Sequence, residues 1–415
     1  MFQNNGHFDV RALALVLLSF GFVLRGIFLL GRKETPQASM PSTASLALAV
    51  VILLYTSTLK EPGIYIIDHL YSAKVIVVSI VLLLLVTPFF LFGRSTPSRA
   101  RSIVLWIAIA LAFTLKIGML SASPNPSIDV FTNLRNGVTS LLSGQNPYLA
   151  VDSLDYLPSN LYLHIIPWWI FGDVRAVYIL AELVTVLSFI FVRTRSITRE
   201  QKSLISLLFL FHPRSLFVLE QAWLDPLILM LLSLFLVLRE RRMLRVASGV
   251  FGYMMSMKQY LIFLPIHFAL LERNLKRFLI MIGVALLTVL PFVIVMGPID
   301  FVRLAVLPLI STPFRADSLT VPAFLVNVLR TQGVTSLWSL GVGAIATLVS
   351  ILLLKQLSAT TRFLAGSIVT MFSLFLFGAQ AFCNYYYLVG GMILWLLLLH
   401  AETDTGEQKT CSTEL

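Results

Sequence analysis

The sequence predicts an all-α, polytopic integral membrane protein, and three observations indicate this class. Hydrophobic residues make up 58% of the 415 residues. Charged residues make up only 12%, whereas soluble domains carry roughly 25%. Apolar runs close to the ~20 residues that a helix needs to cross a bilayer recur along the chain. The net charge of +11 comes largely from Lys and Arg in short loops between these runs, which is typical of cytoplasmic loops.

The first part of the chain, residues 1–121, is expected to form an N-terminal segment of four spans. The spans are predicted at 10–31, 43–59, 75–93 and 102–121. The first run is expected to stay in the protein as a helix, because the residues before it lack the basic region of a cleaved signal. Basic residues follow the first and third spans, which places both loops in the cytoplasm and the chain after Ser121 outside or in a lumen.

The segment 122–172 is the longest polar interruption of the chain and is expected to be an outer loop. Apolar residues from Val130 to Leu142 recur at helical spacing, while Asp129 and polar residues take the opposite face. This pattern predicts a helix that lies along the membrane interface. Asp129 falls in its first turn, where a carboxylate also complements the helix dipole. An aromatic run at 162–169 suits the headgroup level.

The remaining chain is expected to supply nine more spans. They comprise a span at 174–192, two short spans around a turn at 212–226, a tight hairpin around Lys258, and spans at 277–297, 336–355, 362–380 and 386–400. A second outer loop is predicted at 298–335. About thirteen spans result, with the N-terminus outside and the C-terminus inside, although the paired short spans could instead be re-entrant.

Four polar clusters, far apart in sequence, are brought to one membrane face by this topology. They surround Asp129, the turn from Arg214 to Asp225, Lys258, and the segment from Gln380 to Tyr385. A charge deep in a bilayer costs on the order of 2.5–3.5 kcal/mol, so such groups indicate a functional site.

Each cluster also has a structural interpretation. Gln221 and Asp225 are four residues apart and could share a helix face, but Asp225 before Pro226 could equally begin the next helix. Lys258 could snorkel to the interface, or could meet a lipid phosphate at the outer leaflet. Tyr385 and the following tyrosines suit an aromatic belt, which explains Asn384 less well.

The sequence predicts neither a metal nor a cofactor. The histidines lack metal-ligand spacing, and Cys383 and Cys411 are expected on opposite sides of the membrane, which argues against a disulfide. No D-x-D pair and no glycine-rich phosphate loop occur. No basic stripe with interleaved aromatic residues indicates nucleic-acid binding.

Several motifs, in this order, resemble one family of membrane enzymes. They are Ser127-Ile128-Asp129 with Leu134-Arg135-Asn136-Gly137, then LLSGQNPY at 141–148, EQAWLDPL at 220–227, MKQYLIFLP at 257–265 and AQAFCNYYYLV at 379–389. This combination is similar to the GT-C glycosyltransferases, in particular the family 87-like group that includes polyprenol-phosphate-mannose-dependent mannosyltransferases. In that group the aspartate usually follows the first span, whereas four predicted spans precede Asp129 here.

The resemblance implies a GT-C-like catalytic module over residues 122–415 and an inverting glycosyltransferase. By this resemblance Asp129 would be the catalytic base. From its expected position near the outer leaflet, Lys258, together with Arg214, would bind the donor phosphate. The other residues expected to bind substrate are Arg135, Gln145, Asn146, Tyr148, Gln221, Asp225, Gln259, Tyr260, Gln380, Asn384 and Tyr385.

The expected partners are a polyprenyl-phosphate sugar that carries a hexose such as mannose, a glycolipid or glycan acceptor, and membrane lipids. The expected location is the cytoplasmic membrane, or the endoplasmic reticulum in a eukaryote, with the active site on the outer or lumenal face. Two other classes stay open. A secondary transporter or flippase would use Glu220, Asp225 and Lys258 within the membrane. A non-catalytic subunit could keep the same fold.

Overall fold

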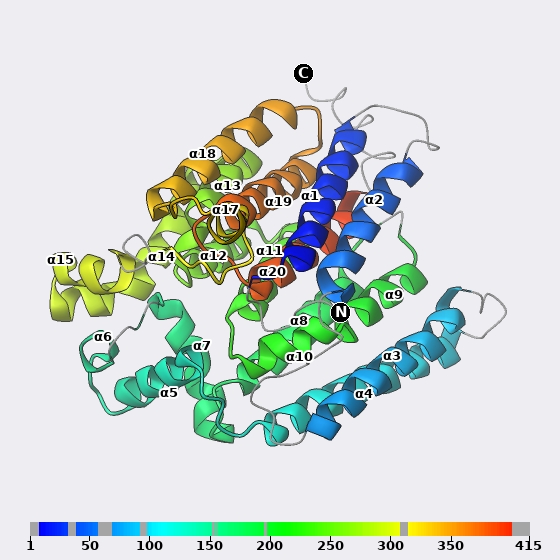
Figure 1. Ribbon diagram of the computed structural model, residues 1–415, viewed down its shortest axis with the longest axis horizontal. Coiled ribbons are helices and arrows are strands. Elements are labelled where there is room, and N and C mark those ends of the chain that lie inside the picture. The colour runs from blue at the N-terminus through cyan, green and yellow to red at the C-terminus, as the bar shows by residue number, and fades with distance from the viewer. Residues whose placement is uncertain are drawn as a thin grey trace.

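The computed structural model describes residues 8–31, 39–56, 69–91, 98–151, 154, 156–194, 197–307 and 314–400, and within these ranges it contains helices but no strand (Figure 1). Six helices are long and apolar enough to cross a membrane, and eight spans result if each of two bent helix pairs counts as one. The structure therefore confirms an all-helical, membrane-embedded protein.

The prediction of about thirteen spans is not confirmed. Several of the expected spans are short helices: α9 (Arg199–Leu210), α10 (Pro213–Glu220), α11 (Asp225–Glu240), α12 (Leu244–Met255) and α13 (Leu264–Glu272). A helix of 12 residues, such as α12, is about 18 Å long, well short of the ~30 Å hydrocarbon core.

The four N-terminal helices pack as two separate pairs. Their bounds are α1 Val10–Gly31, α2 Ser39–Val51 with a π-helical extension η2 at Ile52–Thr56, α3 His69–Leu91 and α4 Ser98–Ala122. Helices α1 and α2 pack on each other and against the C-terminal helices α19 and α20, whereas α3 and α4 pack beside α9 and α10 (Figure 1). At the α1–α2 crossing, the Ser42 hydroxyl donates to the Gly26 carbonyl over 2.9 Å.

The outer loop predicted at 122–172 folds into three helices. They are α5 (Asp129–Leu142), α6 (Pro147–Ala150) and α7 (Pro158–Phe171), followed by α8 (Ala176–Phe191). The apolar face of α5, including Leu134 and Val138, is buried and packs against α7, which confirms the predicted amphipathic helix. The chain turns by 112° between α7 and α8, where Gly172 adopts a φ of 67°.

The C-terminal half places one helix at the centre and others at the edge. Its elements are η3 (Gln259–Phe263), α14 (Leu275–Met296), α15 (Pro298–Phe301), η4 (Val302–Val306), α17 (Val321–Leu329), α18 (Ser336–Leu353), α19 (Ala359–Phe377) and α20 (Cys383–His400). The apolar stretch of α20 is 89% buried, against 17% for α14. Helix α20 contacts α2, α9, α10, α11 and α19.

The two ends of the helical bundle differ in character. At one end, on the left of Figure 1, lie α5, α6, α7 and α15, which we call the outer end. At the opposite end, α11, α13 and α18 finish beside basic residues, and we call it the basic end. Here the buried carboxylate of Glu272 pairs with both Arg239 and Arg277, the latter at 2.6 Å. These two ion pairs tie together the ends of α11, α13 and α14.

Candidate functional site

A buried carboxylate, Asp225, is the centre of the candidate site. It is the first residue of α11, as Pro226 after it predicts, and its side chain is fully buried. Tyr260 donates its hydroxyl to Asp225 Oδ1 over 2.8 Å, and Asn384 Nδ2 donates to Oδ2 over 2.5 Å. These three residues come from α11, η3 and α20, so one hydrogen-bonded group joins three segments far apart in sequence.

Lys258 lies beside this group with its ammonium against two aromatic rings. Its Nζ is 5.0 Å from the centre of the Tyr260 ring and 4.8 Å from that of Tyr385, within the range of cation–π attraction. The side chain is half-buried. It lies in the turn between α12 and η3, where the sequence predicts a tight hairpin. Among the described residues, no carboxylate forms an ion pair with Lys258.

Arg315 lies in the segment before α17, next to Phe382 of the segment before α20. Its guanidinium forms two hydrogen bonds with Asp317, at 2.7 and 2.6 Å, and lies over the Phe382 ring at 5.2 Å. The hydrogen bond to Asp317 raises the pKa of Arg315, and the nearby negative charge of Asp129 raises it further. Asp129 itself is exposed at the first residue of α5, where its Oδ1 accepts from the Val130 amide over 2.8 Å.

The backbone explains why Arg315 lies here. The segment before α17 pairs with the segment before α20, because the Leu319 amide donates to the Ala381 carbonyl over 2.8 Å. The Tyr386 hydroxyl donates to the Leu319 carbonyl over 2.6 Å and fixes the same segment from α20. The residues around Arg315 did not predict this place, because it depends on the long-range pairing.

Arg214 and Gln221 are the two other predicted site residues in the turn from Arg214 to Asp225. Their side chains do not lie as the sequence predicted. The prediction that Gln221 and Asp225 share a helix face is wrong: α10 ends at Glu220 and Ala222 has a φ of 56°. Gln221 Nε2 instead donates to the Glu220 carboxylate over 2.9 Å. Arg214 is only 1% exposed and donates to the Cys383 carbonyl over 3.2 Å, beside Asn384 but away from solvent.

The candidates of the outer loop lie farther along the outer end. Tyr148 is buried, and its hydroxyl donates to the Tyr156 carbonyl over 2.6 Å. Asn146 caps α6 by accepting from the Tyr148 amide, while Gln145 is exposed. Arg135 is half-buried and lies over the Phe131 ring of its own helix at 5.7 Å. These contacts shape the loop, and none of them reaches the Asp225 cluster.

Two glutamines complete the set of predicted residues. Gln259 Nε2 donates to the Ala305 carbonyl over 2.7 Å and so joins η3 to η4. Gln380 is half-buried in the segment between α19 and α20, close in sequence to Phe382, over which Arg315 lies. Both therefore lie next to the cluster in sequence, Gln259 beside Tyr260 and Gln380 before Asn384.

A second group of buried polar residues surrounds Lys116, and the sequence did not predict it. Lys116 Nζ of α4 is 2.6 Å from the Glu182 carboxylate and 2.6 Å from the Ser215 hydroxyl. Tyr387 donates its hydroxyl to Glu182 over 3.3 Å. Lys116 and Glu182 are 2% and 3% exposed, so the ion pair is closed to solvent. Each residue falls within an apolar run, so only the fold brings them together.

Comparison of the chain with models of known families gives no match, and neither curated proteins nor solved structures match it. Among the described residues, no three His, Cys, Asp or Glu side chains come together as metal ligands do.

Proposed function

We propose that the chain is an inverting glycosyltransferase that moves a sugar from a polyprenyl phosphate to an acceptor hydroxyl at the outer end. The observation that carries the proposal is the half-buried ammonium of Lys258, which lies against two tyrosine rings without an acidic partner among the described residues. An ammonium in such a place is suited to a phosphate, because an anion can approach it without displacing a carboxylate.

The second requirement is a base on the same side of the molecule. Asp129 is exposed, and its negative charge raises the pKa of Arg315, whose guanidinium lies over the Phe382 ring. Lys258 lies against the ring of Tyr385, three residues farther along the chain. The proposal places the substrate between Asp129 and Lys258.

The reaction would then proceed as a single displacement. The Asp129 carboxylate takes the proton of the acceptor hydroxyl, and the acceptor oxygen attacks the anomeric carbon. The bond from that carbon to the phosphate oxygen breaks, and polyprenyl phosphate leaves with the electron pair. Lys258 stabilises the charge that develops on the leaving oxygen. Attack opposite the leaving group inverts the sugar carbon.

The buried Asp225 would hold the cluster in place. It fixes the Tyr260 hydroxyl and the Asn384 amide, and Tyr260 in turn provides one of the rings under Lys258. Arg214 would need a different side-chain orientation to reach a phosphate, since its guanidinium is buried against Cys383. Mannose as the transferred sugar, the outer or lumenal face and a GT-C-like fold rest on the resemblance of the motifs and the distribution of basic loops.

The test is transfer of radiolabelled mannose from polyprenyl-phosphate-mannose to a lipid extract of the source cells, in proteoliposomes. We expect Asp129→Asn to lower transfer by about 10²–10⁴-fold, the typical contribution of a general base. Asp300→Asn is the matched control, because Asp300 is another exposed carboxylate of the outer end. Equal loss in both variants, or normal transfer by Asp129→Asn, would contradict the assignment of the base.

A further inference from the structure

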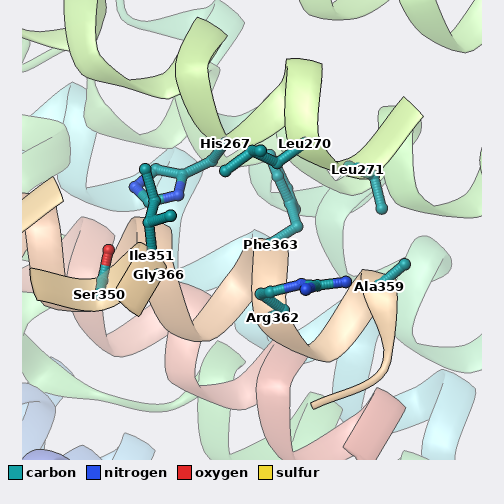
Figure 2. A pocket seen from close by; sticks show the side chains of 9 residues that line it. All are labelled: His267, Leu270, Leu271, Ser350, Ile351, Ala359, Arg362, Phe363 and Gly366. Carbon is teal, nitrogen blue, oxygen red and sulfur yellow. The ribbon is translucent and has the colours of Figure 1, made fainter. Parts of the chain in front are cut away.

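Two buried polar side chains outside the candidate site, His267 and Arg175, differ in what they contact. His267 of α13 lies beside Gly366 of α19, at a cavity between α13, α18 and α19 (Figure 2). The cavity measures about 10 Å³, which is room for about one water. His267 Nε2 lies 2.9 Å from the Thr370 hydroxyl of α19, so this histidine helps to hold two helices together. Arg175 instead contacts the chain on either side of Asp129.

Arg175 lies in the turn between α7 and α8, and Asp173 fixes its orientation. The side chain of Arg175 is fully buried, and the chain bends by 112° at this turn. The backbone amide of Arg175 donates to Asp173 Oδ1 over 2.8 Å, and its Nε and Nη2 donate to the same carboxylate over 3.1 and 2.7 Å. Because one carboxylate binds both the backbone and the planar guanidinium, the side chain has a defined direction.

The guanidinium of Arg175 contacts two residues that flank Asp129 in sequence. Its Nη2 also donates to the carbonyl of Ser123, directly after α4, over 2.7 Å. Its Cζ lies 5.1 Å from the centre of the Phe131 ring in the first turn of α5, within the range of cation–π attraction. Ser123 and Phe131 are 0% and 3% exposed. One buried cation therefore holds the chain six residues before and two residues after Asp129.

The start of α5 depends on such contacts from outside the helix. Ile128 occupies the N-cap position and provides no side-chain hydrogen bond to the first turn. Side chains at this position usually accept from the unpaired amides of a helix start, so α5 lacks one common means of fixing its first residues. Farther along α5, Gly137 packs closely on Leu161 of α7, which holds the middle of the helix. Arg175 supplies the corresponding contact at the end that carries Asp129.

We propose that Arg175 is a positioning residue that fixes the place of Asp129 at the outer end. Arg175 acts through Ser123 and Phe131 and touches no substrate itself. The inference rests on the proposed role of Asp129 as the catalytic base. A base must lie within hydrogen-bond reach of the proton that it takes, and a displacement of about 1 Å can cost about 10²-fold in rate.

Hydrogen exchange of the purified full chain in detergent, followed by mass spectrometry, tests the contact without any transfer reaction. Arg175→Lys keeps the charge and can still pair with Asp173, but an ammonium does not reproduce the planar contacts to Ser123 and Phe131. We expect the amides of residues 125–131 to exchange about tenfold faster, with the amides of α8 unchanged. Arg101→Lys is the matched control, since Arg101 forms an ion pair with Glu200 at the other end of α4.

Phe131→Leu is a second variant that keeps a buried apolar side chain and removes the ring. Loss of the cation–π contact should raise exchange of the same amides by about two- to fivefold. A circular dichroism spectrum confirms that each variant is folded. Exchange of residues 125–131 that is unchanged in either variant, or raised as much in Arg101→Lys as in Arg175→Lys, would overturn the inference.

Transfer kinetics separate a positioning role from a merely structural one. We expect Arg175→Lys to lower kcat by about 10–10²-fold and to change the KM for the donor by less than about twofold. In an Asp129→Asn background, Arg175→Lys should have no further effect on kcat, because it acts only through Asp129. A further loss of the same size in that background would overturn the positioning role. A parent chain that transfers no sugar would contradict the proposed function, and the exchange rates would still decide whether Arg175 fixes this segment.

Discussion

Two lysines of this chain show opposite ways of placing a cation in a membrane protein. Lys116 is 2% exposed and has the Glu182 carboxylate and the Ser215 hydroxyl as partners. Lys258 is half-buried and has only the rings of Tyr260 and Tyr385, with no acidic partner among the described residues. The charge of the first is compensated within the protein, whereas that of the second has no carboxylate partner among the described residues.

Burial alone therefore does not distinguish a charge that binds a ligand from one that stabilises the fold. Taking a charge from water is costly, and a buried pair recovers that cost only through close geometry. The Lys116–Glu182 pair has this geometry and joins α4 to α8, so we interpret it as structural. Neutralising Lys258 should cost the protein little stability, and our proposal assigns its charge to the binding of a phosphate.

The largest expected effect concerns stability. Lys116→Met leaves Glu182 buried without its cation, which should lower the free energy of unfolding by about 3–5 kcal/mol. The measurement is thermal unfolding of the detergent-solubilised protein. The double variant Lys116→Met with Glu182→Leu should regain most of the loss, because the uncompensated charge is gone. If Lys116→Met were as stable as the parent chain, the Lys116–Glu182 pair would have to be accessible to solvent.

For Lys258→Gln we expect a large effect on sugar transfer and a small effect on stability. We expect sugar transfer to fall by about 10²–10³-fold, the cost of removing one group that stabilises developing charge. Loss of the cation–π contacts should cost only about 0.5–1 kcal/mol of stability. Transfer and thermal unfolding are measured on the same preparation. A large loss of stability with little change in transfer would make the two lysines alike and refute the comparison.

Tyr260→Phe tests the support beneath Lys258. The ring remains, but Asp225 loses a hydroxyl donor in a buried site, which should lower the free energy of unfolding by about 1–3 kcal/mol. Tyr162→Phe is the control, because its hydroxyl donates to a neutral carbonyl, that of Thr288, from a half-buried position. Equal small effects in thermal unfolding would indicate that Asp225 does not depend on Tyr260.

The smallest effect is expected for Arg315→Gln. Its guanidinium is already paired with Asp317, and the side chains are 43% and 38% exposed. Exposed pairs contribute about 0–1 kcal/mol, so unfolding should change little. Transfer should fall by less than about tenfold, since a compensated cation stabilises a phosphate less than an uncompensated one. A loss as large as that of Lys258→Gln would assign the phosphate to Arg315.

The local features of the fold were predictable from the sequence, and the long-range ones were not. The amphipathic period predicted α5, and the start of a helix at Asp225 was one of the two interpretations that the sequence left open. The helix break at Ala222 was not predictable, because a non-glycine residue with a positive φ carries no sequence signal.

The residues of the candidate site likewise include some that the sequence predicted and one whose place depends on long-range contacts. Lys258, Tyr260, Asn384 and Asp225 are unusual polar residues within apolar runs, and the structure brings them together. Arg315 looked like one more loop arginine, and its place depends on backbone pairing between two distant loops. The number of spans could not be read from hydropathy, because a short buried helix is as apolar as a short membrane-facing one.

If Asp129 and Lys258 act on one substrate, as we propose, a double-mutant cycle should show that their effects depend on each other. Initial rates of sugar transfer are measured in proteoliposomes for the parent chain, Asp129→Asn, Lys258→Gln and the double variant. Residues that act as a unit are strongly non-additive, so the double variant should be about as active as the weaker single variant. Losses that multiply would show that the two residues act independently, and would contradict a single site at the outer end.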